Sequence, residues 1–165
     1  MAHNTNLLDT PPSRLYTVDQ IGIRILTLSE SFVQDKVLDS AEDAVKFYRE
    51  NIESAPDYEP DQEQVHVLYL STRMHLKHWR LIALGCVNSV ITHAPDVLRP
   101  AVITGCPKFI LMHNHPSGSP EPSEADIRIT RTLIRAAETL QLELADHIIV
   151  GRGKHQSLRE LGYIE

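Results

Sequence analysis

The sequence has few cysteines and no long apolar run, and both shortages exclude classes of protein. Its two cysteines, Cys86 and Cys106, are too few for a disulfide framework and lack a Cys-x-x-Cys spacing, so we expect them to be reduced, buried small residues. No segment approaches the roughly 18–20 consecutive apolar residues of a membrane span. Residues 1–16 lack the basic flank and apolar stretch of a secretory signal. We therefore expect a cytoplasmic protein without a membrane partner.

Basic charge is also scarce. The chain has 16 Lys and Arg against 22 Asp and Glu, giving a net charge of −6 and a pI of about 5.8. Binding to duplex nucleic acid needs clustered basic side chains that neutralise phosphates. The short basic cluster of Arg73, Lys77 and Arg80 is better interpreted as a solvated strand pair and turn. Direct nucleic acid binding is therefore expected to be weak or absent.

What the chain does contain is a normal globular mixture. Hydrophobic residues make up 42% and charged residues 23% of its 165 residues, enough apolar material for the core of one domain with a modest tail.

Apolar periodicity and turn residues predict interleaved strands and helices, hence an α/β sandwich with one central sheet and helices packed on it. After a loose leader at 1–14, the expected strands are 21–28, 65–71, 76–84, 108–113 and 144–151, and the expected helices are 40–52, 94–102 (interrupted by Pro100) and 124–141.

The segment with chemical information is HNHPSGSPEPSEAD, residues 113–126. His113 and His115 are two apart at the end of an apolar strand, so in extended backbone their side chains point to the same side. The following loop, rich in Pro and Gly, can fold Asp126 back toward them, and Ser123 is placed to cap the next helix. Two His and one carboxylate leave a fourth position for water, the pattern of a catalytic zinc site.

Each part of this pattern also has a plain explanation. Ser-Glu-Ala-Asp before an apolar helix is a capping box, in which Asp126 would only stabilise the helix N-terminus. Two histidines two apart arise by chance in a chain with nine. The joint spacing is the specific signal.

That spacing resembles a known family. His-x-His-Pro, with Ser-x-x-Asp starting at Ser123, is the signature of JAMM/MPN metallopeptidases. The longer string HNHPSGSPEPSEADI followed by LADHIIVG is similar to the bacterial RadC-type branch, as are the helix at 40–52, GCVNSV (85–90) and HAPDVLRPA (93–101). The resemblance implies a single domain at 40–165 with a curved mixed β-sheet flanked by helices. Residues 1–39, a leader with a first strand, are too short for the helix-hairpin-helix-like domain of longer RadC proteins.

The same resemblance implies one zinc per chain, held by His113, His115 and Asp126, with Ser123 positioning or stabilising the oxyanion. Family members that hydrolyse amide bonds use an upstream Glu as general base, expected a few residues before Gly85. WRLIALG (79–85) has no carboxylate, and Arg80 or Leu81 stands there. Possible replacement bases are Glu121, in the loop between His115 and Asp126 (the metal loop), and Glu63, before the strand predicted at 65–71. Without one, hydrolysis would be slower by about 10²–10⁴-fold.

Three functions stay open at this level, and direct action on nucleic acid is the third of them. The intact His, His, Ser and Asp set favours a zinc-dependent metallohydrolase acting on an unknown peptide or isopeptide substrate. The missing Glu favours a zinc-stabilised, non-catalytic binding module that acts with DNA repair or replication proteins. His147, in LADHIIV, either packs as a structural histidine or hydrogen-bonds near the site. The sequence does not decide whether the chain forms a homo-oligomer.

Overall fold

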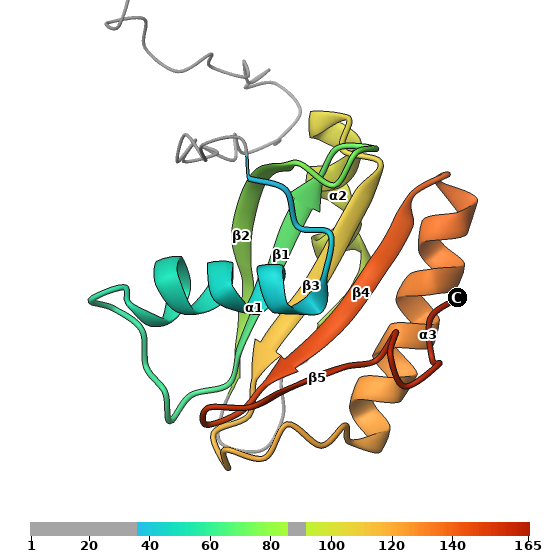
Figure 1. Cartoon of the computed structure of the whole chain (residues 1–165). Coiled ribbons are helices and arrows are strands. Elements are labelled where there is room, and N and C mark those ends of the chain that lie inside the picture. The colour runs from blue at the N-terminus through green and yellow to red at the C-terminus, as the bar shows by residue number, and fades with distance from the viewer. Residues whose placement is uncertain (1–35, 86–91) are drawn as a thin grey trace, which may run out of the picture. The chain divides into compact units, whose positions relative to one another are not determined.

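The computed structural model describes residues 36–85 and 92–165. The expected leader at 1–14, the expected strand at 21–28, Cys86 and most of GCVNSV lie outside the described residues. Within them the order is α1 (Ala41–Tyr48), a π-helical turn (Arg49–Glu53), β1 (Gln64–Leu70), β2 (Leu76–Leu84), α2 (Ala94–Thr104), β3 (Lys108–Asn114), α3 (Glu124–Thr139), β4 (Glu143–Val150) and β5 (His155–Ser157) (Figure 1).

The described strands form a five-stranded sheet in the order β2-β1-β3-β4-β5. Only β3 and β4 run parallel, joined by α3, and the other neighbours are antiparallel. This confirms the predicted α/β class with a mixed sheet flanked by helices. No helix among the described residues is long and apolar enough to cross a membrane.

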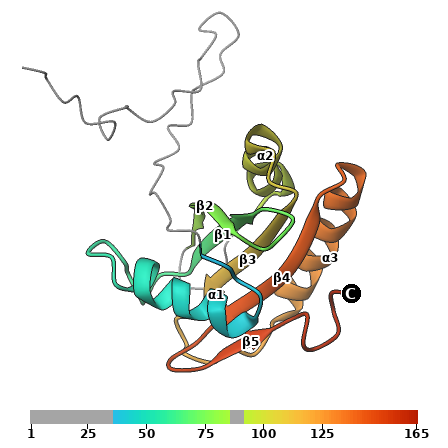
Figure 2. The ribbon, with the colours of Figure 1, turned by 45° about the horizontal axis from the view of Figure 1, so that its top comes forward.

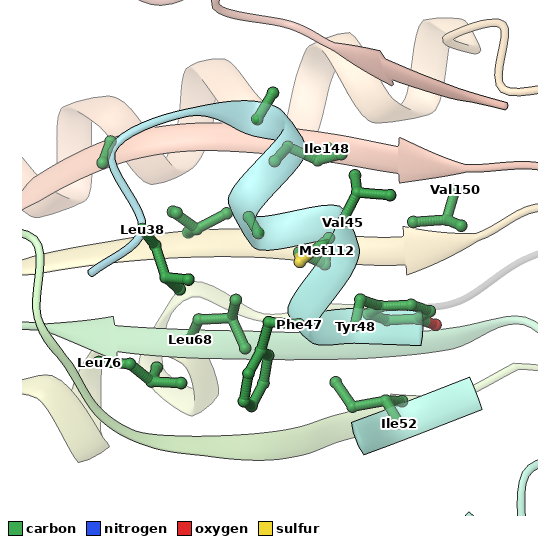
Figure 3. Packing of buried hydrophobic residues seen from close by; sticks show 14 of the residues in the cluster. Leu38, Val45, Phe47, Tyr48, Ile52, Leu68, Leu76, Met112, Ile148 and Val150 are labelled. Carbon is green, nitrogen blue, oxygen red and sulfur yellow. The ribbon is translucent and has the colours of Figure 1, made fainter. Parts of the chain in front are cut away.

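Alternation of side chains along the strands builds two cores. On one face, α1 packs Val45, Phe47 and Tyr48 against Leu68, Met112 and other sheet residues (Figure 3). On the other face, α2 and α3 cover Val67, Phe109, Leu111 and Ile149. The two views in Figures 1 and 2 show α1 lying across one face of the sheet. The sheet is therefore buried on both sides, and a polar side chain on either face needs a partner there.

The predicted interruption of α2 at Pro100 is wrong, because the helix is continuous from Ala94 to Thr104. Pro100 removes the N–H that would bond the carbonyl of Asp96, but Asp96 is exposed, so water can satisfy that carbonyl. Pro100 itself is buried. The helix ends instead at Gly105, whose φ of 66° allows the left-handed cap.

Phe109 offers a test of the core on the α2/α3 face. It is 0% exposed, and it lies between Tyr69 of β1 and Leu144 of β4. Phe109→Ala is expected to lower the free energy of unfolding by about 3–5 kcal/mol, since the cavity adds to the lost transfer energy. Urea denaturation measures it. Val102→Ala, at a side chain 55% exposed, is the control and should change stability by about 0.5 kcal/mol or less. A similar small change for Phe109→Ala would contradict this packing.

Candidate metal centre

The ends of three elements bring the predicted ligands together. His113 is near the end of β3, and Asp126 lies in the first turn of α3. Because β1 runs antiparallel to β3, with Val65 opposite His113, the segment just before β1 lies beside the end of β3. Figure 1 shows β3 and β4 pointing toward the loop that leads into α3. The site therefore depends on sheet order as much as on the His-x-His spacing.

Four side chains converge there. One potential ligand atom from each of Glu63, His113, His115 and Asp126 lies within 4.8 Å of the other three. His113 Nε2 is 3.2 Å from Asp126 Oδ1, 3.1 Å from His115 Nε2 and 3.9 Å from Glu63 Oε1. His113 and Asp126 are buried, while Glu63 and His115 are half-buried. Two imidazole nitrogens and a carboxylate facing one point are a donor set that suits zinc.

Hydrogen bonds fix which nitrogen of His115 faces the group. His115 Nδ1 lies 2.9 Å from the carbonyl oxygen of Ser119. A carbonyl only accepts, so Nδ1 carries the proton and Nε2 of the neutral ring keeps its lone pair. The hydrogen bond with Asp126 raises the pKa of His115 against the effect of burial. A proton and a metal ion thus compete for the same Nε2 position, as expected of a ligand that binds metal in its neutral form.

A longer chain of hydrogen bonds orients His113. Thr130 Oγ1 donates to the Asp126 carbonyl at 2.6 Å and lies 2.6 Å from His147 Nδ1. Because the hydroxyl proton is used, His147 Nδ1 donates to Thr130. Burial holds the pKa of His147 well below its ordinary value, so its Nε2 is free to accept from His113 Nδ1 at 3.0 Å. His113 therefore also presents an unprotonated Nε2. His147 is both buried and in contact with the site.

Asp126 combines the two roles that the sequence leaves open. Its Oδ2 accepts from the backbone N–H of Ser123 at 2.7 Å and from Ser123 Oγ at 2.6 Å, and Ser123 Oγ accepts from the Asp126 N–H at 3.2 Å. This is the capping box of α3. The other oxygen, Oδ1, faces His113. Burial would raise the pKa of Asp126, but Ser123 and, whenever their Nε2 atoms carry a proton, His113 and His115 donate hydrogen bonds that hold it well below its usual range.

Of the two candidate bases, the structure brings only Glu63 into the group. Glu121 is exposed and is not part of it. Of Arg80 and Leu81, the two positions where the family resemblance leads us to expect the Glu, Arg80 pairs with Val67 and Leu81 pairs with His66, and the His66 ring contacts Tyr48 of α1. Paired residues share a face of the sheet, so Leu81 points away from the metal group. In the sequence, the feature that pointed to Glu63 as a candidate base was its position directly before a predicted strand.

The metal loop is anchored on the end of β4. His115 N–H donates to the Val150 carbonyl at 3.0 Å, and Arg152 N–H donates to the Gly118 carbonyl at 3.0 Å. A Cβ atom at Gly151 would overlap the Gly118 carbonyl oxygen, so the loop can approach this closely only over glycine. The end of LADHIIVG is therefore in direct contact with the His-x-His loop.

Comparison with known proteins identifies the family. The RadC-like JAB domain matches residues 38–163. The chain belongs to this family. A UPF0758 protein of Bacillus velezensis is 38% identical over 145 residues, and UPF0758 protein YsxA of Bacillus subtilis is 35% identical over 145 residues; each alignment covers 88% of this chain and 60% of the relative. A relative from Bacillus licheniformis is 42% identical over 103 residues, which are 62% of this chain and 46% of that protein. The chain thus spans about 60% of the two longer-aligned relatives.

Proposed function

We propose that this RadC-like chain is a cytoplasmic, zinc-dependent hydrolase of peptide or isopeptide bonds. His113, His115 and Asp126 hold the zinc, and Glu63 is the general base. The observation that supports it most is the position of Glu63, whose Oε1 lies 3.9 Å from His113 Nε2 in the same group as the three ligands. If Glu63 bound the ion as a fourth protein ligand, the site would be a closed structural one. We propose instead that Glu63 faces the water position, because its Oε1 lies farther from His113 Nε2 than the 3.2 Å of Asp126 Oδ1 and the 3.1 Å of His115 Nε2.

The donor set fits zinc, because both histidines present a lone pair at Nε2 and Asp126 adds one carboxylate oxygen. These residues would hold a zinc ion, which when bound would lower the pKa of a water ligand to about 7 and polarise a substrate carbonyl. Glu63 takes the proton of the attacking water and later delivers it to the leaving amine. Ser123 donates a hydrogen bond to the oxyanion, for which its hydroxyl turns away from Asp126 Oδ2. Because Glu63 supplies a base at the site, we do not expect the hydrolysis slower by about 10²–10⁴-fold that the lack of a general base would cause.

The metal content is the first test. Protein purified without chelator is expected to carry about one zinc per chain, as a site with three protein ligands predicts, and His115→Ala should lose most of it. His155→Ala is the matched control, since His155 lies outside the group and contacts Glu42 at 3.9 Å. Elemental analysis measures all three proteins. Equal zinc in wild type and His115→Ala would contradict the site.

Hydrolysis is then assayed on a panel of peptide and isopeptide substrates, before and after chelation and with zinc restored. Metal-dependent cleavage supports the proposal. Stoichiometric zinc without cleavage of any substrate would instead favour the binding module that acts with DNA repair or replication proteins. Tight binding of duplex DNA at near-physiological salt would contradict the expectation, drawn from the net charge of −6, that the chain binds nucleic acid weakly or not at all.

A further inference from the structure

We infer that Asn114, the residue between the two metal-binding histidines, is a positioning residue for Glu63. This inference rests on the proposed function, in which Glu63 is the general base. Asn114 is 4% exposed and follows His113 in β3, so its side chain points to the opposite face of the sheet. It therefore does not face the metal group, and its side chain contacts the segment before β1.

The contacts of Asn114 lie on both sides of Glu63. Its Oδ1 accepts from the backbone N–H of Gln64 at 2.8 Å, and its Nδ2 donates to the backbone carbonyl of Gln62 at 3.0 Å. A weaker contact from Nδ2 reaches the Pro60 carbonyl at 3.4 Å. The partners fix the orientation of the amide, because an N–H must face the oxygen and carbonyls must face the nitrogen.

The backbone of Glu63 has one further constraint. Its carbonyl accepts from the Gly85 N–H at 2.8 Å, directly after β2. The segment is thus held from β3 through Asn114 and from β2 through Gly85. Without the Asn114 side chain, the Gly85 bond would hold Glu63 to β2 only. The Gln62 carbonyl and the Gln64 N–H would then lose their hydrogen bonds to β3, the strand that carries His113. Asn114 therefore sets the distance between the base and the ligands.

This distance matters because proton transfer depends steeply on geometry. A displacement of about 1 Å at a reacting group can cost about 10²-fold in rate. Alanine at position 114 removes both bonds to the neighbours of Glu63. Aspartate keeps an acceptor for the Gln64 N–H but places a carboxylate oxygen opposite the Gln62 carbonyl, where a donor is required. An amide side chain of this length meets both requirements.

The test combines turnover, zinc affinity and amide exchange. For Asn114→Ala we expect kcat to fall about 10²-fold, with zinc affinity within about threefold of wild type. A purely structural disturbance would change both. Asn51→Ala is the control, because Asn51 also donates to a backbone carbonyl, that of Phe47 at 2.9 Å, and this hydrogen bond lies within its own helical turn. It should retain wild-type turnover.

A double-mutant cycle with Glu63→Gln gives the decisive measurement. If Asn114 acts through Glu63, Asn114→Ala has little further effect once the carboxylate is gone. Equal fold-losses in both backgrounds would overturn the inference. Asn114→Asp is expected to recover no more than part of the turnover.

Amide exchange in the zinc-free protein separates this inference from the proposed function. The Gln64 N–H should exchange at least about tenfold faster in Asn114→Ala than in wild type, because its acceptor is lost. The Leu68 N–H, in the middle of β1, should be unchanged. Faster Gln64 exchange in a chain that hydrolyses nothing would support the role of Asn114 in holding the segment around Glu63, and it would contradict the proposal that the chain is a hydrolase. Unchanged Gln64 exchange would overturn the inference that Asn114 holds the segment around Glu63.

Discussion

Glu63→Gln is expected to lower the turnover number of hydrolysis by about 10²–10⁴-fold, the usual contribution of a general base, while the zinc content stays near that of wild type. Glutamine has the same shape as glutamate but cannot take a proton from water. The three proposed zinc ligands are untouched. Turnover at saturating substrate and elemental analysis of the same preparation measure the two quantities together.

Glu121→Gln is the matched control for this prediction. The substitution is the same, and Glu121 lies in the loop between His115 and Asp126, but it is exposed and outside the metal group. We expect its turnover to stay within about twofold of wild type, as for an exposed side chain without a catalytic contact. A large loss in Glu121→Gln with none in Glu63→Gln would reverse the assignment of the base.

The parts of the site that follow from local spacing could be predicted from the sequence. His113, in β3, and His115, one residue past its end, place their Nε2 atoms 3.1 Å apart, and the Ser123–Asp126 spacing specifies a capping box, which the structure contains. These arguments need only the period of a strand and the start of a helix. They give neither the distance between the elements nor the sheet order.

The parts that depend on strand neighbours could not be predicted in this way. Glu63 joins the group because β1 lies antiparallel beside β3 with Val65 opposite His113. The strand pattern of VHVLYLS carries no information about that neighbour. The same holds for Thr130, which meets His147 only because α3 packs on β4, and for Asn114, whose partners are 50 and 52 residues away in the sequence.

Asp126 explains why the capping-box interpretation and the metal interpretation were equally compatible with the sequence. A carboxylate has two oxygens, and here Oδ2 caps α3 through Ser123 while Oδ1 faces His113. The cap hydrogen-bonds one carboxylate oxygen, so the proposed ligand would already be oriented when a metal binds. This preorganisation is what outer-sphere hydrogen bonds supply to metal ligands in general.

Asp126→Ala and Ser123→Ala are expected to separate these two roles, because both break the capping box and only the first removes a proposed ligand. For Asp126→Ala we expect zinc affinity to fall by more than the roughly 10–100-fold that loss of an outer-sphere partner costs, with no detectable hydrolysis. Competition with a chromophoric chelator measures the affinity. Wild-type zinc affinity in Asp126→Ala would show that this carboxylate is a helix cap only.

Ser123→Ala keeps both histidines and the Asp126 carboxylate. Loss of the N-cap oxygen should lower the free energy of unfolding of the zinc-free protein by about 0.5–2 kcal/mol, measured by urea denaturation. Zinc affinity should fall by no more than about 10–100-fold, because Ser123 is an outer-sphere partner of Asp126. With zinc saturating, kcat should fall about 10²–10³-fold if Ser123 contacts the oxyanion, as we propose. Wild-type kcat in a destabilised, zinc-loaded Ser123→Ala would restrict this hydroxyl to the capping box, since its proton is directed to Asp126 Oδ2.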